Sequence, residues 1–292
     1  MRITVVGDTL LDEDIEGTAT RLSPDGPVPV VDVTVRSRRA GGAGLVATML
    51  ARDGHAVTLV TALSDDDASA HLRRAFEDVE LVAGPSRAPT PVKTRLRAAG
   101  CTIARFDEGC GPPPAPGITA EMRAAIAAAD VLLVADYGRG ITAAPELRAE
   151  LERRSREVPA VWDPHPRGAD PVAAVRMVTP NLAEATAATG HSASPDAAEE
   201  AGRILRTRWG AAAVAVTLGE RGAMLLEDDE EPWVARGEAV TAADPCGAGD
   251  RFAATVATVL AQGGARRDAV RAGVDAAGAY LAAGGVASLL VH

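Results

Sequence analysis

Asp244-Pro-Cys-Gly-Ala-Gly-Asp250, with the alanine-rich run Arg251–Ala261 behind it, is the stretch on which the interpretation of the whole chain depends. Two glycines and an alanine at a helix start leave main-chain N–H groups free to face an anion; these belong to Gly247, Ala248 and Gly249. The next residue, Asp250, can accept a proton from an attacking hydroxyl. This pairing predicts a phosphoryl-transfer centre, because N–H groups stabilise the charge that shifts during transfer. The alternative is a tight turn with an aspartate at a helix start.

Length and charge exclude several classes of protein. The 292 residues can hold one large α/β domain, and we expect a single domain over 1–292. A net charge of −10 argues against a general nucleic-acid or membrane surface. Three widely spaced cysteines without a CxxC pair, and a charged start without a signal peptide, predict a cytoplasmic protein.

The chain has one lysine, Lys93, and every other Lys+Arg residue is an arginine. Lysine is a compact point charge that often binds phosphate, whereas arginine is a planar fork. A phosphate contact would explain this lysine, although chance would also explain it.

Two aspartates follow the first apolar run, Arg2–Val6, which has the pattern of a buried parallel strand. Ligands bind beyond the carboxyl ends of such strands, so Asp8 and Asp12 could contact sugar hydroxyls. The alternatives are an Asx-turn at Asp8 and a solvated loop over Asp12–Asp14.

Two regions alternate apolar and polar residues and predict exposed antiparallel strands: Val28–Arg36, and the pair Pro91–Ala98 with Thr102–Asp107. We expect these regions to form a small β-lid, with segments at about 13–37 and 88–108. Exposed strand edges usually need a partner, so the lid is also a candidate homodimer interface.

From Val131 onward, strands and helices alternate regularly, which predicts a mostly parallel sheet with helices on both faces. Asn181 and Glu184 lie three residues apart at a helix start and could hold Mg²⁺ beside phosphates, or they could simply cap the helix. The turn Leu218-Gly-Glu-Arg-Gly222 could let an adenine lie against the backbone.

The chain resembles the ribokinase-type (PfkB-type) sugar kinases along nearly its whole length, and within them the subgroup of D-glycero-β-D-manno-heptose 7-phosphate kinases. The motifs that carry the resemblance are Gly7-Asp8, Leu11-Asp12, Arg21-Leu-Ser-Pro24, Pro27-Val-Pro-Val30, Gly41-Gly-Ala43, Lys93-Thr-Arg95, Arg105-Phe-Asp-Glu108, Ala135-Asp-Tyr-Gly-Arg-Gly140, Thr179-Pro-Asn-Leu182 with Glu184, and Gly247-Ala-Gly-Asp250. The resemblance implies a ribokinase-like α/β fold and ATP- and Mg²⁺-dependent phosphorylation of the anomeric hydroxyl, with a monovalent cation as a further possible cofactor.

The resemblance also implies roles for individual residues. Asp250 would be the base, and Gly247, Ala248 and Gly249 the anion hole. Asn181 and Glu184 would organise Mg²⁺, and Thr217, Gly219 and Gly222 would border the nucleotide. Asp8, Asp12, Gly41 and Gly42 would contact sugar hydroxyls, whereas Lys93, Arg105, Arg21 and Arg95 would contact the sugar phosphate.

Three residues depart from the family pattern. Leu45 stands where the family has a sugar-binding asparagine, His165 where it has a lysine, and Cys246 where it has a threonine. A kinase for another sugar or a nucleoside, and a non-catalytic binding protein, are therefore the alternatives. Kinases of this family are often fused to a nucleotidyltransferase domain, for which the 292 residues leave no room, so we expect that activity on a separate protein.

Overall fold

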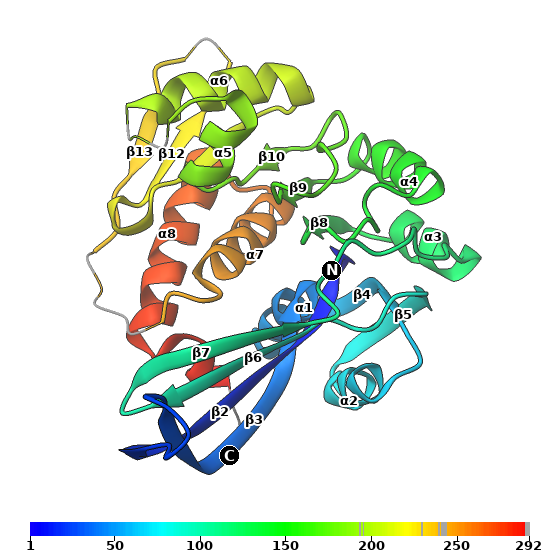
Figure 1. Ribbon diagram of the computed structural model, residues 1–292. Coiled ribbons are helices and arrows are strands. Elements are labelled where there is room, and N and C mark those ends of the chain that lie inside the picture. The colour runs from blue at the N-terminus through cyan, green and yellow to red at the C-terminus, as the bar shows by residue number, and fades with distance from the viewer. Residues whose placement is uncertain (193, 195, 229, 239, 241–243, 290–292) are drawn as a thin grey trace.

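A mostly parallel sheet of nine strands forms the body of the molecule in the computed structural model (Figure 1), which describes residues 1–192, 194, 196–228, 230–238, 240 and 244–289. The strand order is β13-β12-β11-β10-β9-β8-β1-β4-β5. The parallel strands are β1 (Arg2–Gly7), β4 (Ala56–Leu63), β5 (Val79–Pro85), β8 (Val131–Ala135), β9 (Ala160–Asp163), β10 (Met177–Val178) and β11 (Val214–Thr217). The antiparallel edge consists of β12 (Ala223–Leu226) and β13 (Trp233–Ala235).

Helices cover both faces of this sheet. Side chains of α1 (Ala43–Arg52), α2 (Asp67–Ala75), α7 (Ala248–Ala261) and α8 (Arg266–Ala282) share one core with alternate strand residues such as Ile3 and Val5. Side chains of α3 (Ala120–Ala127), α4 (Pro145–Ser155), α5 (Leu182–Thr189) and α6 (Ala197–Trp209) share the other with Val6. Burial on both faces explains why the central strands are continuous apolar runs. Among the described residues, no helix has the length and apolarity needed to span a bilayer.

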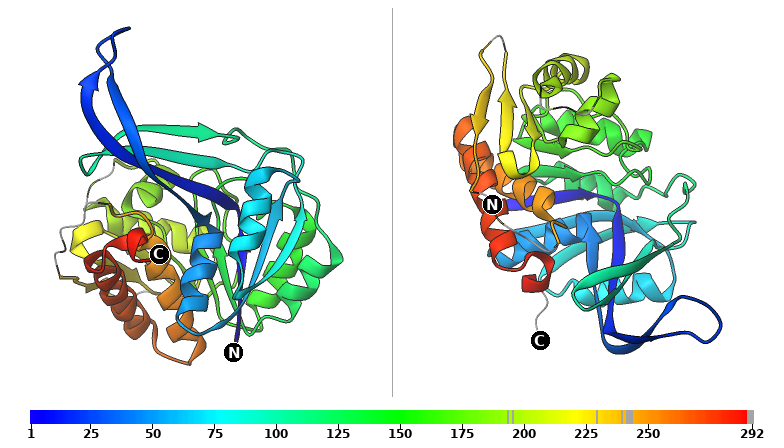
Figure 2. Two further views of the ribbon diagram at one scale, coloured as in Figure 1. Left: turned by 90° about the horizontal axis from the view of Figure 1, so that it is seen from below. Right: turned by 60° about the vertical axis from the view of Figure 1, so that its left-hand side comes forward.

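A second sheet of four strands confirms the predicted β-lid. Its order is β3-β2-β6-β7, built from β2 (Thr9–Leu22), β3 (Pro29–Gly42), β6 (Val92–Ala98) and β7 (Cys101–Glu108). Strands β2 and β6 run parallel, and each has an antiparallel outer neighbour. Figure 2 shows the blue hairpin of β2 and β3 extending beyond the body of the molecule. Only Asp8 separates β1 in the body from β2 in the lid.

The structure differs from expectation at the acidic start of β2, in the length of β3, which continues beyond the predicted Val28–Arg36 to Gly42, and at β13. The solvated loop considered for Asp12–Asp14 is wrong, because these residues lie in β2 and are buried. Each carboxylate there meets an arginine of a neighbouring strand, so the charged run is compatible with a strand. Strand β13 was not predicted, because its three residues are too few to show a period.

Candidate active site

The N-terminus of α7 is where the deciding stretch lies. Gly247 precedes the helix with φ 83°, a left-handed conformation, and an added Cβ there would lie 2.6 Å from Tyr280 Oη. Glycine is therefore required at this position. The N–H of Ala248 donates to the carbonyl of Pro245 at 3.2 Å. The N–H groups of Gly247 and Gly249 meet no acceptor among the described residues, which makes them the freer donors for an anion.

The carboxylate of Asp250 is buried in the first turn of α7, with 8% of the residue exposed. Tyr137 Oη donates a hydrogen bond to Asp250 Oδ1 at 2.6 Å. Burial raises the pKa of Asp250 to about 6, although the Tyr137 hydrogen bond works in the opposite direction. At neutral pH the group is therefore mainly ionised and able to accept a proton, as a general base must.

A cavity of about 780 Å³ opens beside this helix start. It brings together six of the residues predicted from sequence: Asn181, Thr217, Gly219, Gly222, Ala248 and Gly249. Its apolar wall comes from Phe252 of α7 and from Val274, Ala277 and Leu281 of α8. Gly222 has φ 86°, and an added Cβ would lie 2.0 Å from the carbonyl oxygen of Ala235. The volume and the mixed lining suit a nucleotide.

Asn181 and Glu184 form a reciprocal helix cap at the start of α5. The N–H of Glu184 donates to Asn181 Oδ1 at 2.9 Å, and the N–H of Asn181 donates to Glu184 Oε2 at 2.8 Å. Burial raises the pKa of Glu184. No cluster of three or more His, Cys, Asp or Glu side chains in the described part of the chain could hold a metal by itself. The single carboxylate fits Mg²⁺ that is shared with nucleotide phosphates, because Mg²⁺ commonly uses one or two carboxylates plus phosphate oxygens.

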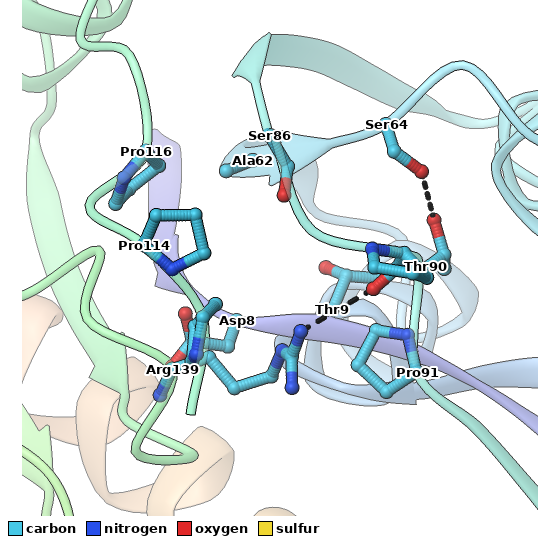
Figure 3. Close-up of a pocket in the computed structure, with 12 residues that line it drawn as sticks. Asp8, Thr9, Ala62, Ser64, Ser86, Thr90, Pro91, Pro114, Pro116 and Arg139 are labelled. Carbon is cyan, nitrogen blue, oxygen red and sulfur yellow. Dashed lines mark hydrogen bonds between the residues drawn. The ribbon is translucent and has the colours of Figure 1, made fainter. Parts of the chain in front are cut away.

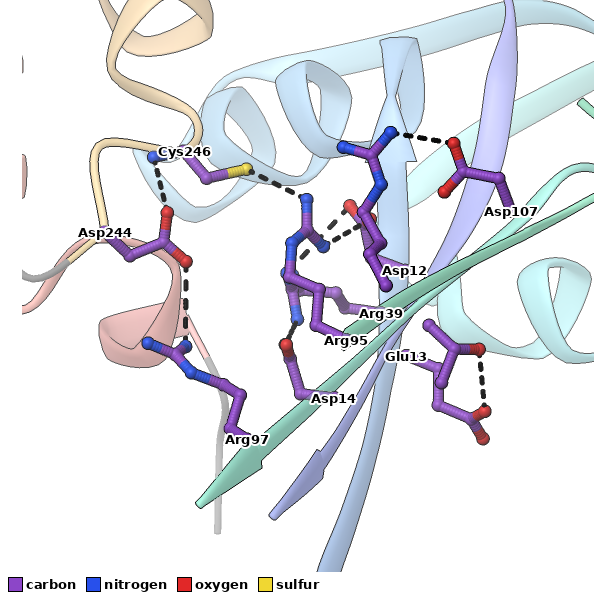
Figure 4. A network of polar contacts seen from close by, with 11 residues as sticks. Asp12, Glu13, Asp14, Arg39, Arg95, Arg97, Asp107, Asp244 and Cys246 are labelled. Atoms are coloured by element: carbon purple, nitrogen blue, oxygen red, sulfur yellow. Dashed lines mark hydrogen bonds and ion pairs between the residues drawn. The ribbon is translucent and has the colours of Figure 1, made fainter. Parts of the chain in front are cut away.

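Asp12 anchors a network of polar contacts at the base of the lid (Figure 4). Arg95 Nη1 donates to Asp12 Oδ1 at 2.9 Å, and Arg39 Nη2 lies 3.9 Å from Asp12 Oδ2. Arg39 also pairs with Asp14. A Cβ on Gly41 would lie 2.4 Å from Asp12 Oδ2, so glycine at this position makes room for the carboxylate.

Alternate residues of β6 face the body of the molecule from the lid. Arg95 Nη2 donates to the sulfur of Cys246 at 3.9 Å, and Arg97 Nη1 lies 3.6 Å from Asp244 Oδ2. Lys93 is two residues before Arg95, so it shares this face of the strand. Burial lowers the pKa of His165 and raises that of Cys110; the charge of Lys93 adds to the first shift and opposes the second. Lys93 therefore lies beside the strand-end loops of the body.

The other two predicted arginines differ in position. Arg105 lies directly opposite Arg95 in the β6–β7 pair and so shares the face of Lys93; it pairs with Asp107 of its own strand at 2.8 Å and is half exposed. Arg21 lies near the far end of the β2–β3 hairpin, where it faces Asp32 at 3.9 Å. Within one copy of the chain, Arg21 is not brought together with Lys93.

Asp8 connects the lid to the body. The N–H groups of Tyr137 and Arg139 donate to Asp8 Oδ2 at 3.3 and 2.9 Å. Burial raises the pKa of Asp8 to about 6. Gly42, with φ 63°, lies so close that a Cβ would be 2.5 Å from the Asp8 carbonyl oxygen. Figure 3 shows the small pocket between Asp8, Arg139 and Thr90 at this junction.

Sequence reasoning missed Tyr137 and Arg139 as parts of the site. The guanidinium of Arg139 donates to the carbonyls of Pro89, Gly109 and Gly111, where the chain enters and leaves the β6–β7 half of the lid. The sequence did contain a signal for them, because both residues follow the carboxyl end of β8. This strand is the parallel neighbour of β1, and ligands bind at the edge of the sheet where the carboxyl ends of parallel strands meet.

Leu45, one of the three departures from the family pattern, belongs to a small hydrophobic cluster. It is 3% exposed and packs with Met49, Tyr280 and Val286. Cys246 is partly buried beside Arg95, and burial raises the pKa of its thiol. His165 stacks on Tyr137 with the ring centres 6.3 Å apart.

Comparison with known proteins agrees with this geometry. Arabidopsis thaliana ribokinase, solved with ribose and ATP, has a TM-score of 0.72 at 20% identity and covers 96% of this chain and 92% of its own. Escherichia coli phosphofructokinase-2 with fructose-6-phosphate gives 0.72 at 18% identity, over 96% and 93% of the two chains. These two confirm the predicted ribokinase-like fold.

Sequence relatives are closer. The bifunctional protein HldE of Streptomyces coelicolor is 44% identical over 98% of this chain, and that of Caulobacter sp. is 34% identical over 96%. The chain spans only 61% and 59% of the lengths of these two relatives. The profile of the pfkB family carbohydrate kinases matches residues 2–291. The chain therefore belongs to the pfkB family of carbohydrate kinases.

Proposed function

We propose that the protein transfers the γ-phosphoryl group of ATP to the anomeric hydroxyl of D-glycero-D-manno-heptose 7-phosphate and forms the 1,7-bisphosphate. The observation that carries this proposal is the buried carboxylate of Asp250 at the start of α7, next to two N–H donors and a cavity of about 780 Å³. The choice of a heptose phosphate is supported by the motifs of the heptose kinase subgroup and by the similarity to HldE.

Each part of the site has one task in this reaction. Asp250 takes the proton of the anomeric hydroxyl as its oxygen attacks the γ-phosphorus. The N–H groups of Gly247 and Gly249 face the negative charge on the transferred group, while the N–H of Ala248 would join them only by leaving the Pro245 carbonyl. Bound Mg²⁺ would supply charge neutralisation, held by Glu184 and Asn181, while Thr217, Gly219 and Gly222 border the nucleotide.

The sugar lies between the lid and the strand ends in this proposal. Its hydroxyls are contacted by Asp8, which lies between β1 and β2, by Asp12 of β2, and by Gly41 and Gly42 at the end of β3. Its phosphate is bound by Lys93 with Arg105 and Arg95. Because Asp12 already neutralises Arg95, Lys93 is the cation on this face of β6 for which no ion pair is present among the described residues.

A kinase for a different sugar is the second candidate, and Leu45 favours it. The buried leucine offers no hydrogen bond where the family has an asparagine, so one hydroxyl contact is missing. A substrate without a hydroxyl at that position would lose nothing.

A coupled assay of ADP release decides among the candidates. Heptose 7-phosphate, fructose phosphates, ribose and adenosine are compared at equal concentration with Mg-ATP. The proposal expects the highest kcat/KM with heptose 7-phosphate. Turnover only with an unphosphorylated sugar would favour the second candidate. ATP binding without turnover on any sugar would indicate a non-catalytic binding protein.

The lid is proposed to form a homodimer. Six of its large apolar side chains are exposed: Leu22, Val28, Val33, Val35, Ile103 and Phe106. They lie on the two edge strands of the lid sheet, at the end of β2 and in the turn between β2 and β3, and exposed apolar surface of this kind favours contact with another protein surface. Val35→Asp should shift the protein to a monomer in sedimentation, whereas Val234→Asp, at an exposed valine outside the lid, should leave the oligomer unchanged. Equal sedimentation of Val35→Asp and wild type would contradict the proposed interface.

The expectation of a separate nucleotidyltransferase stays a prediction. The HldE relatives are named as bifunctional, and the matched region is 61% of the length in Streptomyces coelicolor. In those relatives, therefore, more than one activity belongs to one chain. A nucleotidyltransferase, wherever it is encoded, would act downstream of this kinase and activate the sugar as a nucleotide conjugate.

A further inference from the structure

The chain contains two tyrosines, and only one of them contacts the proposed base. Tyr137 Oη donates to Asp250 Oδ1 at 2.6 Å, while Tyr280 Oη donates to the carbonyl of Cys246 at 3.1 Å. Burial and the neighbouring carboxylate raise the pKa of Tyr137 well above its usual range. Its hydroxyl therefore keeps its proton and remains a donor over the whole working pH range.

The loop that carries Tyr137 is held on several sides. The N–H groups of Tyr137 and Arg139 donate to Asp8 Oδ2, and the N–H of Gly138 donates to Asp136 Oδ1 at 2.7 Å. The ring of His165 stacks on the tyrosine ring. A side chain fixed in this way can hold a hydrogen-bond partner in one orientation, which is the condition for a preorganised site.

We infer that Tyr137 is a positioning residue for Asp250: its hydroxyl binds Oδ1 and leaves Oδ2 to take the proton of the sugar. No donor among the described residues reaches Oδ2. The inference rests on the proposed function, because it takes Asp250 as the base. It adds that the hydrogen bond favours the ionised carboxylate, since a donor stabilises the charged form.

Other groups also act on Asp250, and they come from three elements and from the loop before α7. Asp12 of β2 adds to the effect of burial in raising the pKa of Asp250. Burial raises the pKa of Asp163 at the end of β9, of Cys246 before α7, and of Tyr280 of α8, and the charge of Asp250 adds to each shift. Within the described part of the chain, none of these groups donates a hydrogen bond to the Asp250 carboxylate. The Tyr137 hydroxyl is therefore the group whose removal should change the ionisation of Asp250 most directly.

The test is the pH dependence of kcat for Tyr137→Phe between pH 5.5 and 9. Loss of the donor should raise the pKa of Asp250. The acid limb of the pH profile, where kcat falls because Asp250 becomes protonated, then moves to higher pH. We expect kcat at pH 6.5 to fall about tenfold, while kcat at pH 9 stays within about threefold of wild type. A general loss of structure would lower kcat at every pH. Tyr280→Phe is the matched control, and it should leave the midpoint of the acid limb where it is. His165→Gln excludes the stacked imidazole as the titrating group, and it too should keep the limb.

A second measurement does not depend on removing the side chain. In the Tyr280→Phe background, biosynthetic 3-fluorotyrosine labels Tyr137 alone. The fluorinated phenol is a stronger donor, so the acid limb should move to lower pH. An unchanged limb in both Tyr137→Phe and the fluorinated protein would overturn the inference. Asp250→Asn distinguishes failure of the proposed function from failure of this inference. Retained turnover in Asp250→Asn would refute the proposed function itself. Lost turnover in Asp250→Asn, together with an unchanged acid limb in the two Tyr137 proteins, would refute only the role of Tyr137.

Discussion

Arg95 Nη1 lies 2.9 Å from Asp12 Oδ1, and this ion pair joins β6 to β2 across the centre of the lid. Both side chains are largely buried, with Arg39 on the other side of the carboxylate. The pair therefore fixes β6 against β2, and from this position Arg95 also reaches the sulfur of Cys246 just before α7. Buried pairs of this kind contribute through specific geometry more than through net stability.

Arg95→Met should destabilise the fold, because it leaves a buried carboxylate with only the more distant Arg39. Breaking a buried pair usually costs about 3–5 kcal/mol, and we expect the lower end of that range because Arg39 remains. Urea unfolding measures the loss. Asp12→Leu in the same chain should restore most of the stability but not the activity. If the double variant were as unstable as Arg95→Met, the charge explanation would be wrong.

The sequence predicted the body of the fold well, for a physical reason. Strands such as β8 are buried on both faces, so their composition alone identifies them. The glycine-rich start of α7 was recognisable because a positive φ at Gly247 and close packing restrict the residue type. The acidic start of β2 was open to misreading, because the arginines that neutralise it come from β3 and β6.

Relationships between distant loops could not be predicted from one sequence. Tyr137 and Asp250 are 113 residues apart, and nothing in the local pattern of either residue points to the other. The same is true of Arg139, which donates to carbonyls at Pro89, Gly109 and Gly111. Carbonyl acceptors carry no sequence signal, so such contacts become visible only in the fold.

Gly247→Ala should lower both stability and turnover. The substitution forces a Cβ to 2.6 Å from Tyr280 Oη and into a left-handed conformation, which costs about 1–3 kcal/mol. Gly249→Ala is the control, because nothing lies within 4 Å of its added Cβ. The melting temperature of Gly249→Ala should stay at or slightly above that of wild type. Any loss of turnover in this variant would then mean that the added methyl group hinders the approach of phosphate to the main-chain N–H groups. Equal melting temperatures for the two variants would contradict this reasoning.

Gly278→Leu tests the nucleotide cavity. Gly278 lines the cavity from α8, and an added Cβ meets nothing within 4 Å. A leucine should therefore fill part of the space without disturbing the helix, and it is a better helix former than glycine by about 0.8 kcal/mol. We expect the KM for ATP to rise about tenfold or more, because the leucine would displace the nucleotide from apolar surface that it otherwise covers. The KM for the sugar should stay nearly unchanged. A selective rise in the sugar KM would place the nucleotide elsewhere.

Lys93→Gln should weaken the binding of a phosphorylated sugar. A charge-assisted hydrogen bond is worth about 1.5–3 kcal/mol, so the KM for the sugar phosphate should rise about tenfold or more. The KM for ATP should stay within about twofold, because no residue of β6 lines the nucleotide cavity in the described part of the chain. Lys93→Arg keeps the charge and should lose less. A fall in ATP affinity would contradict the assignment of Lys93 to the sugar phosphate.

Asp250→Asn should lose turnover and gain stability, and the gain should depend on pH. Burial raises the pKa of Asp250 from 3.8 to about 6, so the folded protein disfavours the ionised carboxylate. This penalty is absent below pH 3.8, grows as the pH rises, and is complete above about pH 6, where it reaches at most about 3 kcal/mol. The neutral asparagine avoids the penalty and can still accept the Tyr137 hydrogen bond. Unfolding at pH 4 and pH 8 should thus show a larger advantage for the variant at pH 8, while kcat falls about 10²–10⁴-fold. If the variant were less stable than wild type at pH 8, the carboxylate would stabilise the fold. The explanation that it is kept for catalysis and destabilises the folded protein would then be wrong.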